Sequence, residues 1–264
     1  METPRKKYII ANWKMHFTTG EASLYLNKLS HRIQPSRRIQ VVLAPSTVSL
    51  QPLSLQINRR QFKLAAQNFY WREHGAYTGE VALSQLRGFV DYAIVGHSER
   101  RYVFGEREED IAQKVAAAIR SNITPILCIG ETAFERKDGE TGAAIYSQLA
   151  SGLHEVSKED ISKVIIAYEP VWAISSNKNA RPAKPIDIIE AERLIRKHIA
   201  KLYGKEIAEE ISILYGGSVN KDTARGYLEI PGIDGLLIGN ASLIADQFCA
   251  IVEIAKGVKN ERQD

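Results

Sequence analysis

The stretch Val164-Ile165-Ile166-Ala167-Tyr168-Glu169-Pro170-Val171-Trp172-Ala173-Ile174 decides how this chain is interpreted. Its first five residues form a short apolar run with three β-branched side chains, which predicts a buried strand. Proline restricts the residue before it to extended geometry, so we expect Glu169 at the carboxyl end of that strand and outside any helix. A carboxylate in this position is suited to be a general base, although most Glu-Pro pairs are simple turns.

Similar short apolar runs recur along the whole chain. They are residues 8–11, 39–44, 62–66, 92–95, 123–129, 164–168, 211–215 and 235–238. Most are separated by longer stretches with helical periodicity, of which residues 107–120 and 188–202 are the clearest because each places apolar side chains on one stripe. Strands that alternate with helices pair in parallel through crossover helices.

The number of these units predicts the fold class. Eight strand–helix units in 264 residues, with no linker rich in Pro, Gly or Ser, indicate an α/β protein with a single (β/α)8 barrel. A doubly wound sheet is the alternative, and it calls for a glycine-rich turn after the first strand. The chain has Asn12-Trp13-Lys14-Met15 there, which favours the barrel. We expect one domain over residues 1–264, with a flexible extension at residues 1–7 and a flexible tail at residues 258–264.

Composition and charge exclude several classes of protein. A hydrophobic content of 44% with 25% charged residues is ordinary for a globular protein. The net charge of +4 predicts neither nucleic-acid nor membrane binding, but suits mild attraction of anionic substrates. Two cysteines make no disulfide framework and favour a reducing compartment. No apolar run approaches a signal-peptide core or the roughly 18 residues of a membrane span, so we expect a cytoplasmic protein.

In a parallel barrel the reactive side chains gather where the strands end. The predicted strands end in Asn12 and Lys14, in Gly96-His97-Ser98-Glu99-Arg100, in Glu169, in Gly216-Gly217-Ser218 and in Gly239-Asn240-Ala241-Ser242. Each feature also has an ordinary explanation: Lys14 as a solvated surface charge, His97 as a loop residue, and the diglycine as a tight turn. Their shared place on one predicted rim favours a functional site.

This set of side chains indicates one kind of chemistry. The histidines are scattered and the cysteines do not form a Cys-x-x-Cys pair, so we expect no metal and no cofactor. Ser98 lacks the glycine-flanked elbow of a nucleophilic serine. The set suits proton abstraction beside a carbonyl, with Glu169 as base, His97 polarising the carbonyl and Lys14 facing the developing enediolate. Backbone N–H groups in the two glycine turns suit a phosphate, so the substrate expected is a small phosphorylated aldehyde or ketone.

Several motifs resemble those of the triosephosphate isomerase family. They are Ala11-Asn12-Trp13-Lys14-Met15, Val95-Gly96-His97-Ser98-Glu99-Arg100-Arg101, Cys128-Ile129-Gly130-Glu131, Tyr168-Glu169-Pro170-Val171-Trp172-Ala173-Ile174 and Leu214-Tyr215-Gly216-Gly217-Ser218-Val219. The resemblance covers nearly the whole chain. It implies a TIM barrel and a glycolytic isomerase that interconverts dihydroxyacetone phosphate and D-glyceraldehyde 3-phosphate through an enediolate. An isomerase for another small sugar phosphate and a catalytically silent binding or scaffold barrel remain as alternatives.

The resemblance also implies a role for each residue of the set. Glu169 would move the proton between C1 and C2 of the triose. His97 would donate a hydrogen bond to the carbonyl oxygen as a neutral imidazole, because the helix that starts at Ser98 disfavours the imidazolium. Lys14 would stabilise the enediolate and the phosphate, with Asn12 fixing its surroundings.

Further residues are implied as phosphate contacts or supports. The expected phosphate-binding residues, besides Asn12 and Lys14, are Ser175, Ser218, Gly239 and Asn240. The expected supporting residues are Glu99, Tyr215 and Cys128. Glu99 either anchors Lys14 or is simply a carboxylate at a helix start. Residues 170–180 would form a lid over the phosphate, which Tyr215 and Ser218 would hold when it is shut.

A homodimer is the partner that the resemblance implies. Gln67-Asn68 and Gly75-Ala76-Tyr77-Thr78-Gly79-Glu80 resemble a loop that docks beside the active site of a second copy, which would bring Thr78 close to Asn12 and Lys14 of the other subunit. The alternative is an ordinary long surface loop. An exposed Tyr70-Trp71 pair would be unfavourable in a monomer.

The chain departs from the family's pattern at two expected phosphate contacts. Ser175-Ser176-Asn177 stands where the family has Gly-Thr-Gly, and Asn240 stands where it has a second glycine. Glycine reaches positive φ freely, whereas other residues do so at a cost of about 1 kcal/mol or more. We therefore expect backbone strain at both places and an altered closure of the lid.

Overall fold

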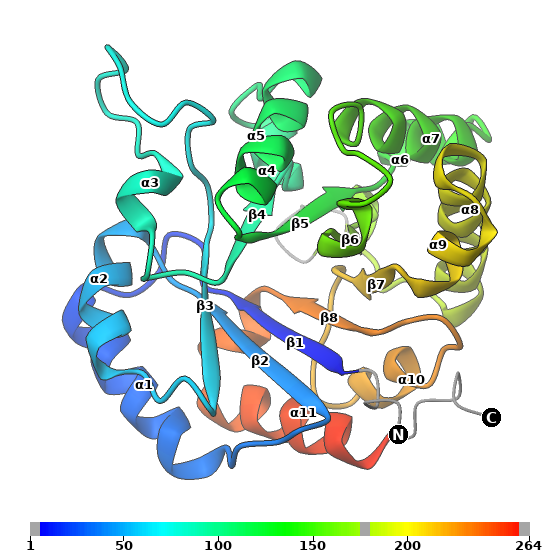
Figure 1. The fold of residues 1–264 in the computed structure, drawn as a ribbon. Coiled ribbons are helices and arrows are strands. Elements are labelled where there is room, and N and C mark those ends of the chain that lie inside the picture. The colour runs from blue at the N-terminus through cyan, green and yellow to red at the C-terminus, as the bar shows by residue number, and fades with distance from the viewer. Residues whose placement is uncertain (1–5, 175–179, 259–264) are drawn as a thin grey trace.

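The strands of the chain close into one barrel. The computed structural model describes residues 6–174 and 180–258, in which all eight strands pair in parallel with their neighbours in chain order and β8 pairs with β1 (Figure 1). The strands are β1 (Lys7–Asn12), β2 (Ile39–Ala44), β3 (Phe62–Ala66), β4 (Tyr92–Val95), β5 (Thr124–Ile129), β6 (Ile165–Tyr168), β7 (Ser212–Tyr215) and β8 (Gly235–Ile238). The predicted (β/α)8 barrel is confirmed.

Helices surround the barrel and cover its outer face (Figure 1). They are α1 (Thr19–Arg32), α2 (Thr47–Gln56), α3 (Leu83–Leu86), α4 (Ser98–Tyr102), α5 (Glu108–Arg120), α6 (Ala133–Lys137), α7 (Thr141–Gly152), α8 (Pro185–Tyr203), α9 (Lys205–Glu210), α10 (Ala224–Leu228) and α11 (Ala245–Gly257), with 3-10 turns η1 (Ile161–Lys163), η2 (Val171–Ala173) and η3 (Asn240–Leu243). None of these helices is long and apolar enough to cross a membrane within the part of the chain that is described.

Each strand is apolar on both faces because both faces are buried. In β1, Ile9 and Ala11 pack outward against the helices, whereas Ile10 joins a second cluster inside the barrel. The inner cluster also includes Val42, Ile94 and other side chains of medium size, which fill the barrel interior. This two-sided burial explains why the strands read as continuous apolar runs in the sequence.

The predicted element boundaries are correct to within a few residues. Ile123, Val164 and Ile211 were expected inside strands, but each precedes the strand that it leads into. All three side chains are buried at that position, so hydrophobicity extends beyond the hydrogen-bonded ladder. The helix expected from residue 107 begins at Glu108, after an extended Arg107.

Two residues that were expected in flexible ends, Lys7 and Val258, are part of the fold. Lys7 belongs to β1, and its buried side chain donates hydrogen bonds to the carbonyl oxygens of Leu228 (3.1 Å) and Ile233 (3.4 Å). At the other end, Val258 packs against the core. Residues 1–7 were expected to be flexible because they are charged. The amine of Lys7, however, donates hydrogen bonds to carbonyl oxygens of the barrel, so residue 7 is part of the fold.

The contact between β8 and β1 has no room for a side chain at one position. Gly235 pairs with Tyr8, and a Cβ atom on Gly235 would lie 2.0 Å from the Tyr8 carbonyl oxygen. By contrast, a Cβ on Gly226 in α10 would meet no atom within 4 Å. A backbone neighbour cannot rotate away as a side chain can, so closure of the barrel requires glycine at residue 235.

We predict that Gly235→Ala lowers the free energy of unfolding by at least about 3 kcal/mol, because the added methyl group overlaps backbone atoms. Gly226→Ala is the control and should be neutral or stabilise by up to about 1 kcal/mol, since alanine is favoured in helices. Urea unfolding followed by circular dichroism measures both. Equal stability of the two variants would contradict the closure argument.

Candidate active site

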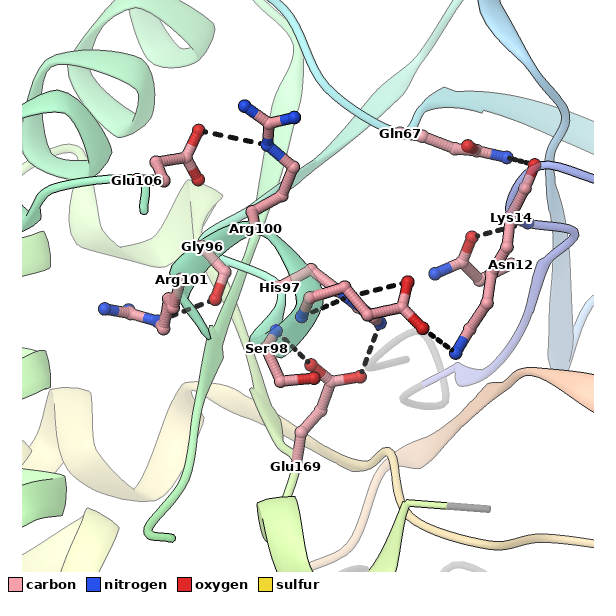
Figure 2. A network of polar contacts seen from close by, with 11 residues as sticks. Asn12, Lys14, Gln67, Gly96, His97, Ser98, Arg100, Arg101, Glu106 and Glu169 are labelled. Carbon is pink, nitrogen blue, oxygen red and sulfur yellow. Dashed lines mark hydrogen bonds and ion pairs between the residues drawn. The ribbon is translucent and has the colours of Figure 1, made fainter. Parts of the chain in front are cut away.

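The structure brings together the four residues that were expected to carry the chemistry. Asn12 ends β1, Lys14 follows two residues later, His97 precedes α4, and Glu169 follows β6. The Asn12, His97 and Glu169 residues are each no more than 6% exposed, and the Lys14 side chain is 16% exposed. Parallel pairing places all of these strand ends on one rim, so residues far apart in the sequence become neighbours (Figure 2).

The loop that carries Lys14 is held in a strained conformation. Lys14 has a φ of 51°, in the left-handed region that a lysine seldom adopts. Its N–H donates to Asn12 Oδ1 (3.1 Å), and its carbonyl oxygen accepts a hydrogen bond from Gln67 Nε2 (2.9 Å). The same Gln67 nitrogen donates to the Ala44 carbonyl oxygen (2.8 Å). These contacts on both sides of the residue stabilise a backbone shape that would otherwise relax (Figure 2).

Charged and polar groups form a chain across the rim. Lys14 Nζ lies 2.5 Å from Glu99 Oε1, and Glu99 Oε2 lies 3.7 Å from His97 Nδ1. His97 Nε2 lies 3.3 Å from Glu169 Oε1, and the Ser98 N–H donates to Glu169 Oε2 at 3.5 Å. Of the two alternatives for Glu99, the structure shows the contact with Lys14. The base, the imidazole and the amine are connected through adjacent contacts (Figure 2).

Glu169 fits its position only because two neighbours are glycines. A Cβ on Gly130 would lie 2.1 Å from the Glu169 carbonyl oxygen. A Cβ on Gly216 would lie 2.6 Å from Glu169 Cγ and 3.2 Å from its Oε1. The loops after β5 and β7 thus approach the backbone and the side chain of Glu169 so closely that they leave the carboxylate little freedom.

The surroundings of Glu169 keep it ionised. Burial alone raises the pKa of its carboxyl group, but the nearby imidazole of His97 and the ammonium of Lys14 outweigh burial, and the net shift of the pKa is downward. Cys128, also inside the barrel, is a buried thiol whose pKa is raised far above its usual range by burial and by the Glu169 charge. Cys128 is therefore a neutral neighbour of Glu169 and not a nucleophile.

The pKa of His97 is shifted toward the charged imidazole. Burial lowers the pKa of its imidazole, but the carboxylates of Glu169 and Glu99 raise it by more, so the net shift is upward. The Glu99 N–H, at the start of α4, donates to His97 Nδ1 (3.2 Å). Nδ1 is therefore an acceptor, and in the neutral ring the proton lies on Nε2. The helix start therefore favours the neutral ring, whereas the contact of Glu169 with Nε2 favours the charged one.

The glycine turn after β7 contacts the segment that follows Glu169. Ser218 donates twice to the Ala173 carbonyl oxygen, from its N–H (2.9 Å) and from its hydroxyl (2.7 Å). A Cβ on Gly217 would overlap the buried Tyr215 hydroxyl at 2.1 Å. Among the described residues, that hydroxyl has no partner in hydrogen-bonding geometry. Ser218 thus contacts η2, where the expected lid begins, and Tyr215 lies against Gly217 of the same turn.

The turn after β8, residues 239–243, faces Lys14. A Cβ on Gly239 would lie 3.5 Å from Lys14 Cε. The Ser242 N–H and hydroxyl both donate to the Gly239 carbonyl oxygen, at 2.8 and 2.7 Å. Asn240 is exposed and begins η3 with a negative φ, so the strain expected there is wrong: a 3-10 turn accepts any residue at its start. The other departure, Ser175-Ser176-Asn177, lies outside the described residues.

The loop between β3 and α3 stands out from the barrel (Figure 1). Thr78 of this loop is exposed. Tyr70 and Trp71 were expected to be exposed, but both are half-buried and stack on each other with their ring centres 5.3 Å apart. Trp71 also packs against the core, which explains its burial in a single chain.

Two contacts of the rim were missed from the sequence. Gln67 was assigned only to a loop, although its amide joins the Lys14 and Ala44 carbonyls; nothing in the local sequence pattern indicates this. Glu131 is fully buried and accepts hydrogen bonds from Trp172 Nε1 (2.7 Å) and the Tyr168 hydroxyl (3.1 Å). The available signal for Glu131 was a glutamate two residues after a buried strand, close to the position that Glu169 has after its own strand.

A closed parallel barrel with a carboxylate, an imidazole and an amine in contact on one rim defines a (β/α)8-barrel enzyme. The sequence model of the family "Triosephosphate isomerase" matches residues 7–255. The chain belongs to the triosephosphate isomerase family, and it is an isomerase.

The chain is similar in sequence to several triosephosphate isomerases along nearly their full length. The triosephosphate isomerase of Caldanaerobacter subterraneus subsp. tengcongensis is 43% identical over 249 residues, which are 94% of this chain and 99% of that protein. The triosephosphate isomerase of Geotalea uraniireducens is 40% identical over 253 residues, 96% of this chain and 100% of that protein. That of Clostridium perfringens is also 40% identical, over 96% of this chain and 99% of its own length.

The coupling of His97 and Glu169 predicts how stability depends on pH. The raised pKa of His97 stabilises the fold fully below the imidazole's unfolded value of about 6.5, and this contribution is lost as pH rises through the folded pKa. The lowered pKa of Glu169 stabilises the fold above the carboxyl group's unfolded value of about 4.3, and this contribution is lost as pH falls through the folded pKa. Both contributions are therefore present between about pH 4.5 and 6.5.

We predict that His97→Gln costs more stability at pH 5.5 than at pH 8.5, because glutamine keeps a hydrogen bond but carries no charge. Urea unfolding at the two pH values measures the difference. His154→Gln, at an exposed histidine, is the control and should show no such pH dependence. A cost of His97→Gln that is equal at both pH values would contradict the coupling.

Proposed function

We propose that this chain interconverts dihydroxyacetone phosphate and D-glyceraldehyde 3-phosphate by proton transfer through an enediolate, with Glu169, His97, Lys14 and Asn12 as the catalytic residues. The observation that carries the proposal is the contact of a buried, ionised Glu169 with His97, which leads through Glu99 to Lys14. Acid–base chemistry beside a carbonyl needs a base, a hydrogen-bond donor and a fixed positive charge within the span of one small molecule.

Glu169 is the base in this proposal. Its carboxylate is ionised at neutral pH and excluded from water, so its oxygens are available to take a proton from C1 or C2 of a bound triose. A substrate between Glu169 and His97 would separate the two side chains. The main upward influence on the His97 pKa would then be removed, and burial together with the Glu99 N–H would favour the neutral ring that donates from Nε2.

Lys14 and the two glycine turns supply the charge and the donors for the anionic parts of the substrate. Lys14 faces Gly239 of one turn, and Gly216 of the other turn lies against Glu169. We assign the phosphate to N–H groups at Gly239, Asn240 and Ser218, beside Lys14. Because the Ala173 carbonyl oxygen accepts both Ser218 donors, binding of phosphate there requires that this contact be exchanged.

Glu169→Gln is predicted to lower kcat about 10²- to 10⁴-fold, because the amide cannot accept the proton. KM should change little, since glutamine has nearly the same shape. A coupled assay with glyceraldehyde 3-phosphate measures both constants. The matched control is Glu192→Gln, which alters a buried carboxylate of α8 that pairs with Arg196, away from the rim; kcat should remain within about twofold of the parent.

The same assay distinguishes the alternatives. A loss of less than tenfold in kcat for Glu169→Gln would overturn its role as base. Turnover of the parent far below about 1 s⁻¹ would favour another small sugar phosphate as substrate, or a silent barrel. Substrate screening with other phosphorylated aldoses and ketoses then separates these two outcomes.

We also propose that two copies associate through the face that carries the loop between β3 and α3. Met15 and Val48 are 96% and 75% exposed on that side of the rim. Their loops meet, because the Gln67 amide joins the carbonyls of Lys14 and Ala44. Large apolar side chains exposed beside a projecting loop suit a second copy of the chain, whose Thr78 would then approach Asn12 and Lys14.

We predict that Val48→Asp converts the dimer to monomers at micromolar concentration, because a buried charge has no partner in an apolar interface. Light scattering after size-exclusion chromatography measures the mass. Phe134→Asp introduces the same charge at an equally exposed apolar residue on α6, after β5 and across the barrel, and should leave the mass unchanged. A parent protein with the mass of one chain would contradict the proposal.

A cytoplasmic location is proposed as well. Its support is the cysteine chemistry: both Cys128 and Cys249 are free thiols in the interior of the protein, which fits a reducing compartment.

A further inference from the structure

We infer that Tyr25 is a positioning residue, which fixes the turn after β8 relative to the loop that carries Lys14. The inference rests on the proposed function, because it assigns a purpose to the distance between Lys14 and the donors of that turn. Tyr25 belongs to α1, outside the rim, and it acts through its contacts with Trp13, Phe17 and Ser242.

The hydroxyl of Tyr25 makes a buried contact with the turn. It donates to the Ser242 carbonyl oxygen at 2.6 Å. Ser242 is fully buried, and its N–H and hydroxyl both donate to the Gly239 carbonyl oxygen. The turn is therefore stabilised by the internal hydrogen bonds of Ser242 and by the hydrogen bond from Tyr25 of α1. Removing the Tyr25 hydroxyl would leave a buried carbonyl without its donor.

The ring of Tyr25 contacts the loop that carries Lys14. Trp13 directly precedes Lys14, and its ring meets Tyr25 edge to face with 5.4 Å between centres. Phe17 stacks on Tyr25 at 4.9 Å and meets Trp13 edge to face at 5.4 Å. The three rings form a closed triangle beneath the loop.

The loop that carries Lys14 has two residues with strained backbone angles, and one of them, Phe17, supplies a ring of this triangle. Lys14 and Phe17 have φ angles of 51° and 65°, which cost energy in residues with a side chain. Aromatic packing against Trp13 and Phe17 therefore stabilises the conformation that presents the Lys14 amine. One side chain, Tyr25, thus contacts the Lys14 loop with its ring and the turn after β8 with its hydroxyl, and Gly239 of that turn lies against Lys14.

Tyr25→Phe isolates the hydroxyl, because phenylalanine keeps the ring and its packing. We expect KM for glyceraldehyde 3-phosphate and the inhibition constant of inorganic phosphate to rise about three- to tenfold, as for one lost buried hydrogen bond. The value of kcat should stay within about twofold, since Lys14 keeps its aromatic support. Steady-state kinetics with phosphate as competitive inhibitor measures these constants.

Tyr203→Phe is the matched control. The Tyr203 hydroxyl also donates to buried backbone carbonyls, those of Leu153 (2.9 Å) and Val156 (3.2 Å), but at the last residue of α8. Both variants should lose similar thermal stability, whereas only Tyr25→Phe should weaken phosphate binding. Unchanged phosphate binding in Tyr25→Phe, or an equal change in Tyr203→Phe, would overturn the inference.

Failure of the proposed function gives a different result. If the parent binds inorganic phosphate in titration calorimetry but does not isomerise the triose, the proposed reaction is wrong, and the calorimetric comparison of Tyr25→Phe with Tyr203→Phe still decides the role of Tyr25. If the parent binds no phosphate, the inference is overturned together with the phosphate assignment.

Discussion

A carboxylate that is buried must have its charge balanced, and the rim of this barrel is arranged around that requirement at Glu169. His97 contacts one oxygen of the carboxylate and Ser98 donates its N–H toward the other, while Lys14 adds a more distant positive charge. Gly130 and Gly216 lack the side chains that would displace it. Four loops from different strands thus contribute to one ionised group. Burying a charge is costly even when it is paired, so a buried ionised group at a rim points to function.

Closure of the barrel makes this convergence possible. The ladder between β1 and β8 joins the first strand to the last, and it places Lys14 opposite the turn that begins at Gly239. Outside the barrel, α1 and α11 lie side by side (Figure 1). Tyr25 of α1 reaches the same turn through Ser242. The two ends of the chain therefore contribute, from both layers of the fold, to the region that we assign to the phosphate.

Strands and site residues that follow from the local sequence pattern could be predicted, whereas residues that act through contacts with distant parts of the chain could not. All eight strands were found because two-sided burial makes each a continuous apolar run, although Ile123 shows that burial extends past a strand. Glu169 was located by the proline that follows it. Gln67 and Tyr25 were missed because their partners lie on other loops. Asn240 was expected to be strained because a residue type shows which backbone angles are tolerated and not which one is adopted.

The pairing of β1 with β8 also sets the order in which the molecule can be completed. Tyr8 is synthesised before its partner Gly235, which lies 227 positions later in the sequence (235 − 8). At a synthesis rate of about 5–20 residues per second, one edge of β1 remains unpaired for on the order of tens of seconds before β8 is synthesised. During that time an apolar strand edge is open to pairing with other chains. The Lys14 loop lacks the facing turn for the same period, so the nascent chain should acquire activity only after β8 has emerged from the ribosome.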